Sequence, residues 1–135
     1  GGWFNAATGF GALGYAMGAS IGAAMASPDR RILCLVGDGG MMFHPGELRT
    51  ALDENVDVTF VVFNNHGYGE IARSMLDAGA EVLGCTPSAP DMEALAKASG
   101  LRYDVCSDSE LPALVASGKG PRLIEVERKK VSEFK

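Results

Sequence analysis

The sequence predicts an α/β fold in which a parallel sheet is flanked by helices. Two short apolar runs rich in β-branched residues, 32–36 and 58–63, are bounded by Gly, Asp or Asn, as buried strands of parallel sheets are. Segments with helical patterns alternate with such runs, and this alternation is typical of βαβ units. A chain of 135 residues with 47% hydrophobic residues is long enough to form one domain around a buried core.

The first half of the chain predicts a helix, a strand and a second helix. Small residues on one face of segment 12–26 indicate a helix that packs closely on its neighbours, and Pro28 ends it. The strand 32–36 follows after a turn. Pro45 suits the start of a helix over 45–54, because its missing amide hydrogen is not needed there.

The second half continues the alternation after the strand 58–63. A short helix over 68–77 leads into a loop over 78–89, which contains two Gly and a Pro. Asp91 is well placed to cap the N-terminus of the next helix. The remaining expected elements are a helix over 91–99, a strand over 101–105, a helix over 107–116, a strand over 121–126 and a polar tail over 127–135.

The most informative feature is a pair of polar motifs at the ends of the two early strands. Gly37-Asp38-Gly39-Gly40 follows the first strand directly, and Asn64-Asn65 follows the second. Because parallel strands end at the same edge of a sheet, one carboxylate and one amide should lie side by side there. Hard oxygen ligands beside a glycine-rich turn suit magnesium, which in turn holds phosphate oxygens. Taken singly, Asp38 could instead cap the next helix, and Asn65 could form an Asx-turn.

These motifs resemble the thiamine diphosphate-binding motif, in which Gly-Asp-Gly is followed by a spacer of roughly two to three dozen residues and then by Asn-Asn. Asp38 and Asn65 are 27 positions apart, which fits that motif. Segments 9–14 and 19–23 resemble the cofactor-facing part of the same enzymes, and the closest likeness is to the acetolactate synthase and 2-oxo acid decarboxylase group. The likeness covers nearly the whole chain. It implies a thiamine diphosphate-binding fold in which Asp38, Asn65 and the backbone carbonyl of Gly67 bind magnesium.

The resemblance also implies which residues contact thiamine diphosphate. The backbone amides of Gly39 and Gly40 would bind the diphosphate, and the family often has Ser or Ala at the position of Gly40. The Gly11 carbonyl resembles the acceptor for the cofactor's aminopyrimidine. Leu13 resembles the apolar wedge beneath the cofactor, with a place in the core as the alternative. The full expected cofactor-binding set is Gly11, Leu13, Gly37, Asp38, Gly39, Gly40, Asn65, Gly67 and Tyr68.

The activity that the resemblance implies is decarboxylation of 2-oxo acids, ending by protonation or by carboligation. Several simple decarboxylases carry an acid six positions after the Asn ligand; here that position is Ile71, and Glu70 lies one earlier. The family's catalytic glutamate comes from a pyrimidine-binding domain of the same or a partner subunit, so no catalytic residue is assigned in this chain. Residues 1–135 are therefore expected to be the cofactor-binding domain of a larger, homo-oligomeric enzyme, and to be inactive alone.

Two other functions stay open from the residues. Gly9, Gly11 and Gly14 spell Gly-x-Gly-x-x-Gly, and Asp38 follows at a strand end roughly twenty residues on, which is typical of nicotinamide-dinucleotide-binding oxidoreductase domains. That interpretation needs a strand just before Gly9, but the sequence of residues 1–8 is a poor candidate for a strand. It also gives the Asn pair no role. The other possibility is a non-catalytic fragment that keeps the fold but has lost the site.

Composition argues against several further classes. A formal net charge of −5 argues against binding to nucleic acid, which needs a basic face. No apolar run approaches the roughly 18–20 residues that cross a membrane. Cys34, Cys85 and Cys106 are scattered, with no Cys-x-x-Cys pair, and indicate reduced thiols in the cytoplasm. His44 and His66 could act as acid–base groups, but ordinary packing is the favoured interpretation.

Overall fold

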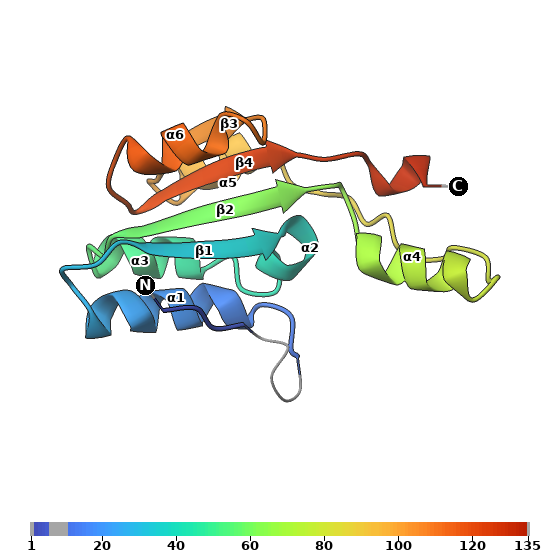
Figure 1. The fold of residues 1–135 in the computed structure, drawn as a ribbon, viewed down its shortest axis with the longest axis horizontal. Coiled ribbons are helices and arrows are strands. Elements are labelled where there is room, and N and C mark those ends of the chain that lie inside the picture. Colours follow the sequence, from blue (N-terminus) through green and yellow to red (C-terminus); the bar gives the residue numbers. More distant parts are fainter. Residues whose placement is uncertain (1, 6–10, 135) are drawn as a thin grey trace.

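The computed structural model of the chain describes residues 2–5 and 11–134. Its centre is a sheet of four strands in the order β1-β2-β4-β3, and every neighbouring pair is parallel (Figure 1). The strands are β1 (Ile32–Gly37), β2 (Val58–Asn64), β3 (Arg102–Cys106) and β4 (Arg122–Glu127). The predicted class, a parallel α/β sheet flanked by helices, is confirmed.

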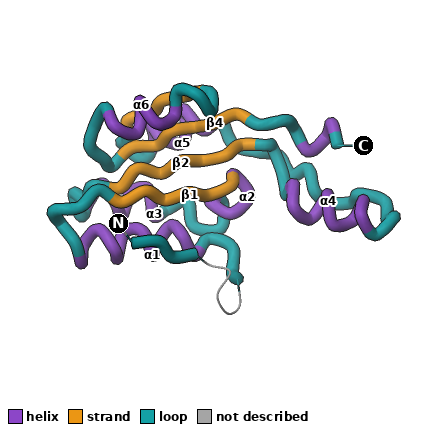
Figure 2. The backbone as a smooth tube through the Cα atoms, in the orientation of Figure 1, coloured by secondary structure: helices purple, strands orange, loops and turns teal. Residues whose placement is uncertain are grey.

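Helices lie on both faces of this sheet (Figure 2). One face packs against α1 (Tyr15–Ala26), α3 (Glu47–Asp53) and α5 (Met92–Ala98), and these elements form the main hydrophobic core. The other face carries α6 (Leu111–Ala116), where the carbonyl of Leu114 accepts a hydrogen bond of 2.5 Å from the buried Arg122 guanidinium. Among the helices of the described residues, none combines the length and apolar character needed to cross a membrane.

The main core is built from side chains that alternate along the strands. Cys34, Phe60 and Leu123 occupy paired positions on β1, β2 and β4, and all three are buried against the helices of one face. Burial raises the pKa of the Cys34 thiol to about 11, so the group stays protonated and unreactive at neutral pH. The three cysteines are free, and this one serves as a small apolar core residue.

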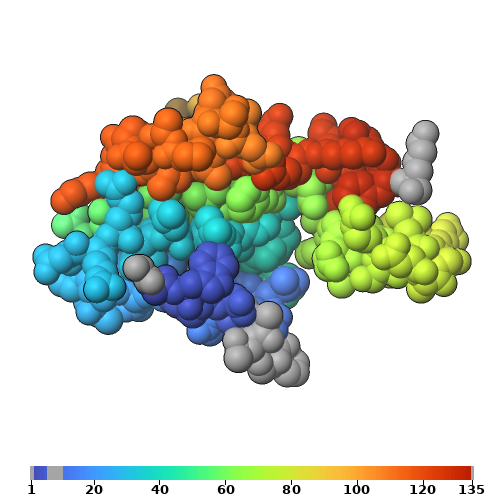
Figure 3. Space-filling model, in the orientation of Figure 1, coloured from blue at the N-terminus to red at the C-terminus, as the bar shows by residue number. Residues whose placement is uncertain are grey.

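A second, smaller hydrophobic cluster lies beyond the carboxyl ends of the strands. It joins α4 (Gly69–Asp77) to the 3₁₀ helix η1 (Val131–Glu133). Its buried members are Ala72, Cys85 and Val131. Figure 3 shows α4 projecting from the sheet together with the C-terminal segment. The predicted polar tail over 127–135 is therefore wrong in part, because Val131 is only 3% exposed and Phe134 packs against the same cluster.

Two helix boundaries differ from the sequence expectation for local reasons. α1 begins at Tyr15 and not at residue 12, because Gly14 adopts a left-handed φ of 86° that a helix does not continue. α6 begins later than predicted, because the Glu110 carboxylate accepts hydrogen bonds from the amide and hydroxyl of Ser107 and closes a separate turn. The predicted cap of α5 is confirmed: the Asp91 side chain accepts a hydrogen bond of 2.9 Å from a first-turn backbone amide.

Phe60 lies fully buried in the main core on β2. We expect Phe60→Ala to lower the free energy of unfolding by about 3–5 kcal/mol, because removing a buried ring leaves a cavity. Urea denaturation followed by circular dichroism measures the change. Leu83→Ala is the control: that side chain is 63% exposed, and its loss should change the free energy by no more than about 0.5 kcal/mol. Equal losses in the two variants would contradict this description of the core.

Candidate functional site

The ends of β1 and β2 bring the two polar motifs together. Gly37 pairs with Phe63 in the parallel register, so the residues that follow each strand start side by side. After β1 the chain forms the short helix α2 (Asp38–Met41), for which the sequence predicts no helix. After β2 it forms a turn over residues 65–67, here named the 65–67 turn. Figure 1 shows α2 beside the end of β2.

Asp38 links the two strand ends through its buried carboxylate. Its Oδ2 accepts a hydrogen bond from the Gly67 amide at 2.9 Å, and its Oδ1 accepts a longer one from the Asn65 amide at 3.4 Å. The alternative that Asp38 caps the following helix is wrong, because α2 has Gly37 at its N-cap and no side-chain cap hydrogen bond. The carboxylate instead orders the 65–67 turn.

Asn65 presents an oxygen without a hydrogen-bond partner. Its Oδ1 is buried and has no partner among the described residues. Its Nδ2 lies so close to Gly69 that a Cβ on that glycine would overlap it. A buried acceptor left unpaired costs roughly 1–3 kcal/mol, and a bound cation would remove that cost. The Asx-turn alternative for Asn65 is wrong: Asn64 makes that turn, since its Oδ1 accepts the His66 amide at 3.0 Å.

Glycines let several backbone segments meet at this point. A Cβ on Gly39 would lie 2.8 Å from the Tyr68 ring and 3.6 Å from the carbonyl oxygen of Gly67. A Cβ on Gly67 would overlap the carbonyl of Cys85, and the Tyr68 amide donates to that same carbonyl at 2.9 Å. The glycines therefore allow the backbone of the 65–67 turn to lie in close contact with α2 on one side and with the loop at Cys85 on the other.

The residues at this edge of the sheet carry oxygens of the kind that a hard divalent cation such as Mg²⁺ binds. These oxygens are the carboxylate oxygens of Asp38, the unpaired amide oxygen of Asn65 and the carbonyl oxygen of Gly67. Mg²⁺ takes oxygen ligands and usually keeps part of its shell for water and phosphate oxygens. No three His, Cys, Asp or Glu side chains cluster in the part of the chain that the structure describes. The donors that a metal would meet here are therefore amide, backbone and carboxylate oxygens.

Three other predicted cofactor residues, Gly37, Gly40 and Leu13, lie at or beside α2 and the end of β1. Gly37 ends β1, and Gly40 lies within α2. A Cβ on Gly40 would lie 3.9 Å from Leu13 Cδ2, so Leu13 lies beside α2. Leu13 is 49% exposed, so the alternative that it belongs to the core is wrong. Gly11 adopts a left-handed φ of 67°, whereas Gly9 lies outside the described residues.

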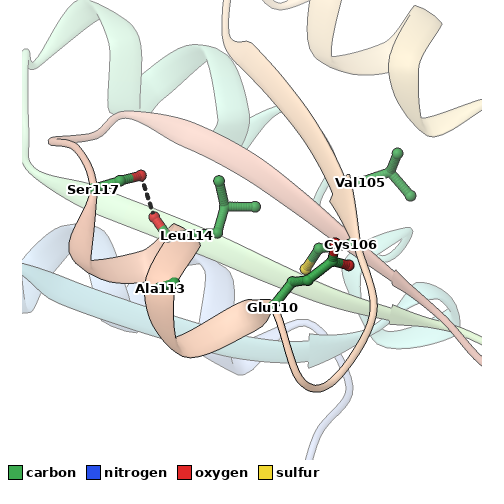
Figure 4. Close-up of a pocket in the computed structure, with 6 residues that line it drawn as sticks. All are labelled: Val105, Cys106, Glu110, Ala113, Leu114 and Ser117. Carbon is green, nitrogen blue, oxygen red and sulfur yellow. Dashed lines mark hydrogen bonds between the residues drawn. The ribbon is translucent and has the colours of Figure 1, made fainter.

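A separate hollow of about 370 Å³ lies between β3 and α6 (Figure 4). Its polar groups already have partners: the Ser117 hydroxyl donates to the Leu114 carbonyl at 2.8 Å, and Glu110 accepts from Ser107. Burial, with a smaller effect from Glu110, raises the pKa of the Cys106 thiol and so makes it a weaker nucleophile at neutral pH. This hollow offers no activated group for catalysis.

Sequence reasoning missed two residues that shape the site. Gly69 follows Tyr68 at the start of α4, and only the structure shows that a side chain there would strike Asn65. Glu125 is 7% exposed on β4, where it accepts hydrogen bonds of 2.6 Å each from Asn64 and Tyr103. The sequence does contain a signal for Glu125, which is a single acid inside the apolar run of the last strand. A carboxylate buried in a sheet needs polar partners, so its presence there predicts a buried hydrogen-bond network.

Several curated proteins resemble the chain over most of its length. A probable 2-ketoarginine decarboxylase of Pseudomonas aeruginosa is 40% identical over 94 residues, which are 69% of this chain and 17% of that protein. The acetolactate synthase large subunit of Parasynechococcus marenigrum is 33% identical over 113 residues, which are 82% of this chain and 18% of that protein. The acetolactate synthase isozyme 3 large subunit of Escherichia coli is 33% identical over 100 residues, which are 73% of this chain and 17% of that protein. The chain thus spans less than a fifth of each of these relatives.

The family model described as the C-terminal TPP-binding domain of thiamine pyrophosphate enzymes matches residues 1–126. That range contains both polar motifs and reaches into the last strand of the sheet. The match gives the Asn pair a place in a known cofactor-binding fold, which the nicotinamide alternative does not. The chain therefore belongs to the thiamine pyrophosphate enzyme family, as a C-terminal TPP-binding domain.

Proposed function

We propose that this chain binds thiamine diphosphate through a magnesium ion and forms the cofactor-binding domain of an enzyme that decarboxylates 2-oxo acids. The observation that carries the proposal is the buried Oδ1 of Asn65, which has no hydrogen-bond partner among the described residues. The backbone N–H of the same residue donates a hydrogen bond to the Asp38 carboxylate. A buried polar atom needs a partner, and a magnesium ion held between these side chains and a diphosphate would provide one. Membership of the family supports the choice of cofactor.

Each residue of the site has a proposed role in holding the metal and the diphosphate. Asp38, Asn65 and the carbonyl of Gly67 would bind magnesium. The backbone amides of Gly39 and Gly40 would bind the diphosphate, because glycine lets a phosphate approach the backbone closely. Thiamine diphosphate, when bound, supplies an electron-accepting ring that lets a 2-oxo acid lose carbon dioxide. The chain itself orients that group and offsets the negative charge of its phosphates.

Three further residues would contact the organic part of the cofactor. Leu13 is half exposed beside α2, and the Tyr68 ring lies against Gly39, so both present apolar surface next to the proposed phosphate position. The backbone carbonyl of Gly11 would accept a hydrogen bond from the aminopyrimidine. These contacts would fix the orientation of the cofactor and shield it from water.

The complete enzyme is proposed to include parts outside this domain. The relatives named above are much longer, since the chain spans 17% or 18% of each. A pyrimidine-binding domain on the same or a partner subunit of a homo-oligomer would supply the catalytic glutamate. The relatives are named as a 2-ketoarginine decarboxylase and as acetolactate synthases, and the proposal covers reactions that end by protonation as well as by carboligation. A cytoplasmic location is proposed separately, on the basis of the scattered cysteines, which are free in the structure.

Isothermal titration of thiamine diphosphate into the chain should detect binding that requires Mg²⁺. Asp38→Asn removes the negative charge from the proposed ligand set but keeps its shape, and we expect the affinity to fall at least about tenfold, which equals about 1.4 kcal/mol. Asp29→Asn is the matched control, because Asp29 is exposed in the turn between α1 and β1, at the opposite end of the strands. The control variant should bind as the native chain does.

Three results, from that titration and from a thermal-shift measurement with a nicotinamide dinucleotide, would count against the proposal in different ways. Equal affinity of Asp38→Asn and the native chain would remove Asp38 from the site. Stabilisation of the chain by a nicotinamide dinucleotide without magnesium would favour the oxidoreductase alternative. Failure of the folded native chain to bind would favour a fragment that keeps the fold without the site.

Gly69→Ala tests the role of Asn65 without changing any proposed ligand. The new Cβ would overlap Asn65 Nδ2 and displace the amide, so we expect magnesium-dependent binding to weaken about tenfold. Stability should change by less than about 1 kcal/mol, because Ala is favoured over Gly in a helix. In the control Gly46→Ala, a Cβ just before α3 meets nothing within 4 Å. Calorimetry and thermal unfolding give both quantities, and equal affinity of the two variants would exclude Asn65 as a ligand.

The 135-residue chain alone should not consume 2-oxo acids, because the proposed catalytic glutamate lies outside it. A coupled assay with pyruvate, magnesium and thiamine diphosphate should give the rate seen with the cofactors and no protein. Consumption of pyruvate that exceeds this background, and that disappears in Asp38→Ala, would refute the proposal that a catalytic part is supplied by another domain.

A further inference from the structure

Asn64, the first residue of the Asn pair, has no place in the proposed ligand set, yet its side chain is buried and both of its polar atoms form hydrogen bonds. It lies at the end of β2. Its Nδ2 donates a hydrogen bond of 2.6 Å to Glu125 Oε1 on the neighbouring strand β4, and its Oδ1 accepts one of 3.0 Å from the His66 amide. The side chain therefore connects β4 to the 65–67 turn.

Glu125 is the buried charge that fixes the direction of these bonds. Its second oxygen, Oε2, accepts a hydrogen bond of 2.6 Å from the Tyr103 hydroxyl on β3. None of the Lys or Arg side chains in the described residues forms an ion pair with it. A carboxylate can only accept, so the amide of Asn64 must turn its Nδ2 toward Glu125 and its Oδ1 toward the turn. The reverse orientation would bring two oxygens into contact.

The orientation of Asn64 has a consequence for the neighbouring residues of the turn. His66 is held at a positive φ of 56°, which residues other than Gly adopt rarely. The hydrogen bond from the His66 amide to Asn64 Oδ1 stabilises that conformation. Asn65 and Gly67 flank His66, and the amides of both donate to Asp38. The conformation at His66 thus decides whether Asn65 and Gly67 can face Asp38 together.

We propose that Glu125 is a positioning residue for the 65–67 turn and acts on it through Asn64. This inference rests on the function proposed above, in which that turn supplies two of the three magnesium ligands. Glu125 itself lies on β4, and its hydrogen bonds in the described structure go to Asn64 and Tyr103, not to a proposed ligand. Its role is to set the orientation of the Asn64 side-chain amide, because that orientation determines the backbone conformation of the 65–67 turn. The backbone conformation then determines where the Asn65 side chain and the Gly67 carbonyl point.

A donor–acceptor swap tests this role. Asn64→Asp places two carboxylates in contact, and we expect magnesium-dependent binding of thiamine diphosphate to weaken about 10–100-fold, the usual effect of disturbing groups that orient metal ligands. Adding Glu125→Gln restores complementarity, because the new amide nitrogen donates to the introduced carboxylate and the new amide oxygen accepts from Tyr103. We expect the double variant to recover native affinity, measured by calorimetry.

Backbone hydrogen exchange in the magnesium-free chain gives a second readout that needs no cofactor. In Asn64→Asp the amides of His66 and Gly67 should exchange faster relative to the core strands, and in the double variant they should return to the native rate. Ile124→Ala is the matched control: Ile124 is buried next to Glu125 on β4, and its aliphatic side chain takes no part in the hydrogen bonds that join Glu125 to Asn64 and Tyr103. It should lower stability without weakening binding or exposing the turn.

The two readouts separate the inference from the proposed function. If the native chain binds no magnesium, the proposed function fails, and the exchange rates alone decide whether Glu125 positions the turn. Native affinity and native exchange in Asn64→Asp would overturn the inference, as would a folded double variant that stays as weak as the single one. If Asn64→Asp does not fold, recovery of folding, binding and slow exchange in the double variant supports it.

Discussion

The hydrogen bonds between the 65–67 turn and the Asp38 carboxylate are the interaction on which this site depends. They join the end of β1 to a turn that follows β2, across 27 and 29 positions in the sequence. Burying a carboxylate without a cation is unfavourable, and two backbone amides offset part of that cost. The same bonds hold Asn65 and Gly67 beside the carboxylate, and these three residues are the ones proposed above to bind magnesium.

The parallel sheet supplies the coarse placement, and small residues supply the fine placement. Register alone sets β1 and β2 to end together. Contact between α2 and the turn then depends on Gly39 and Gly67, where a side chain would collide with Tyr68 or with the Cys85 carbonyl. The strands thus place the residues of the site at one edge of the sheet, and the absence of side chains at Gly39 and Gly67 lets the backbone segments approach one another.

Much of this arrangement follows from local sequence. β1 and β2 could be predicted because β-branched runs stop at Gly, Asp or Asn, and Asp38 could be placed near Asn65 because parallel neighbours end at one edge. The helix α2 could not, since Gly39 and Gly40 have poor helix propensity and tertiary contacts outweigh it. Nor could the partner of Asn64, because Glu125 is 61 positions away and no local pattern reports which strands pair.

The described residues form two hydrophobic clusters of very different size, and the 65–67 turn follows β2, which belongs to the larger one, and precedes α4, which belongs to the smaller one. The smaller cluster buries only three residues, so α4 and η1 should have lower local stability than the sheet. The turn is tied to that region as well, since the Asn65 carbonyl accepts the Val131 amide at 2.9 Å and the Tyr68 amide reaches the loop at Cys85. If the proposed site binds its cofactor, the ordering of the turn should extend to α4 through these hydrogen bonds, and the local stability of α4 would then report whether the site is occupied.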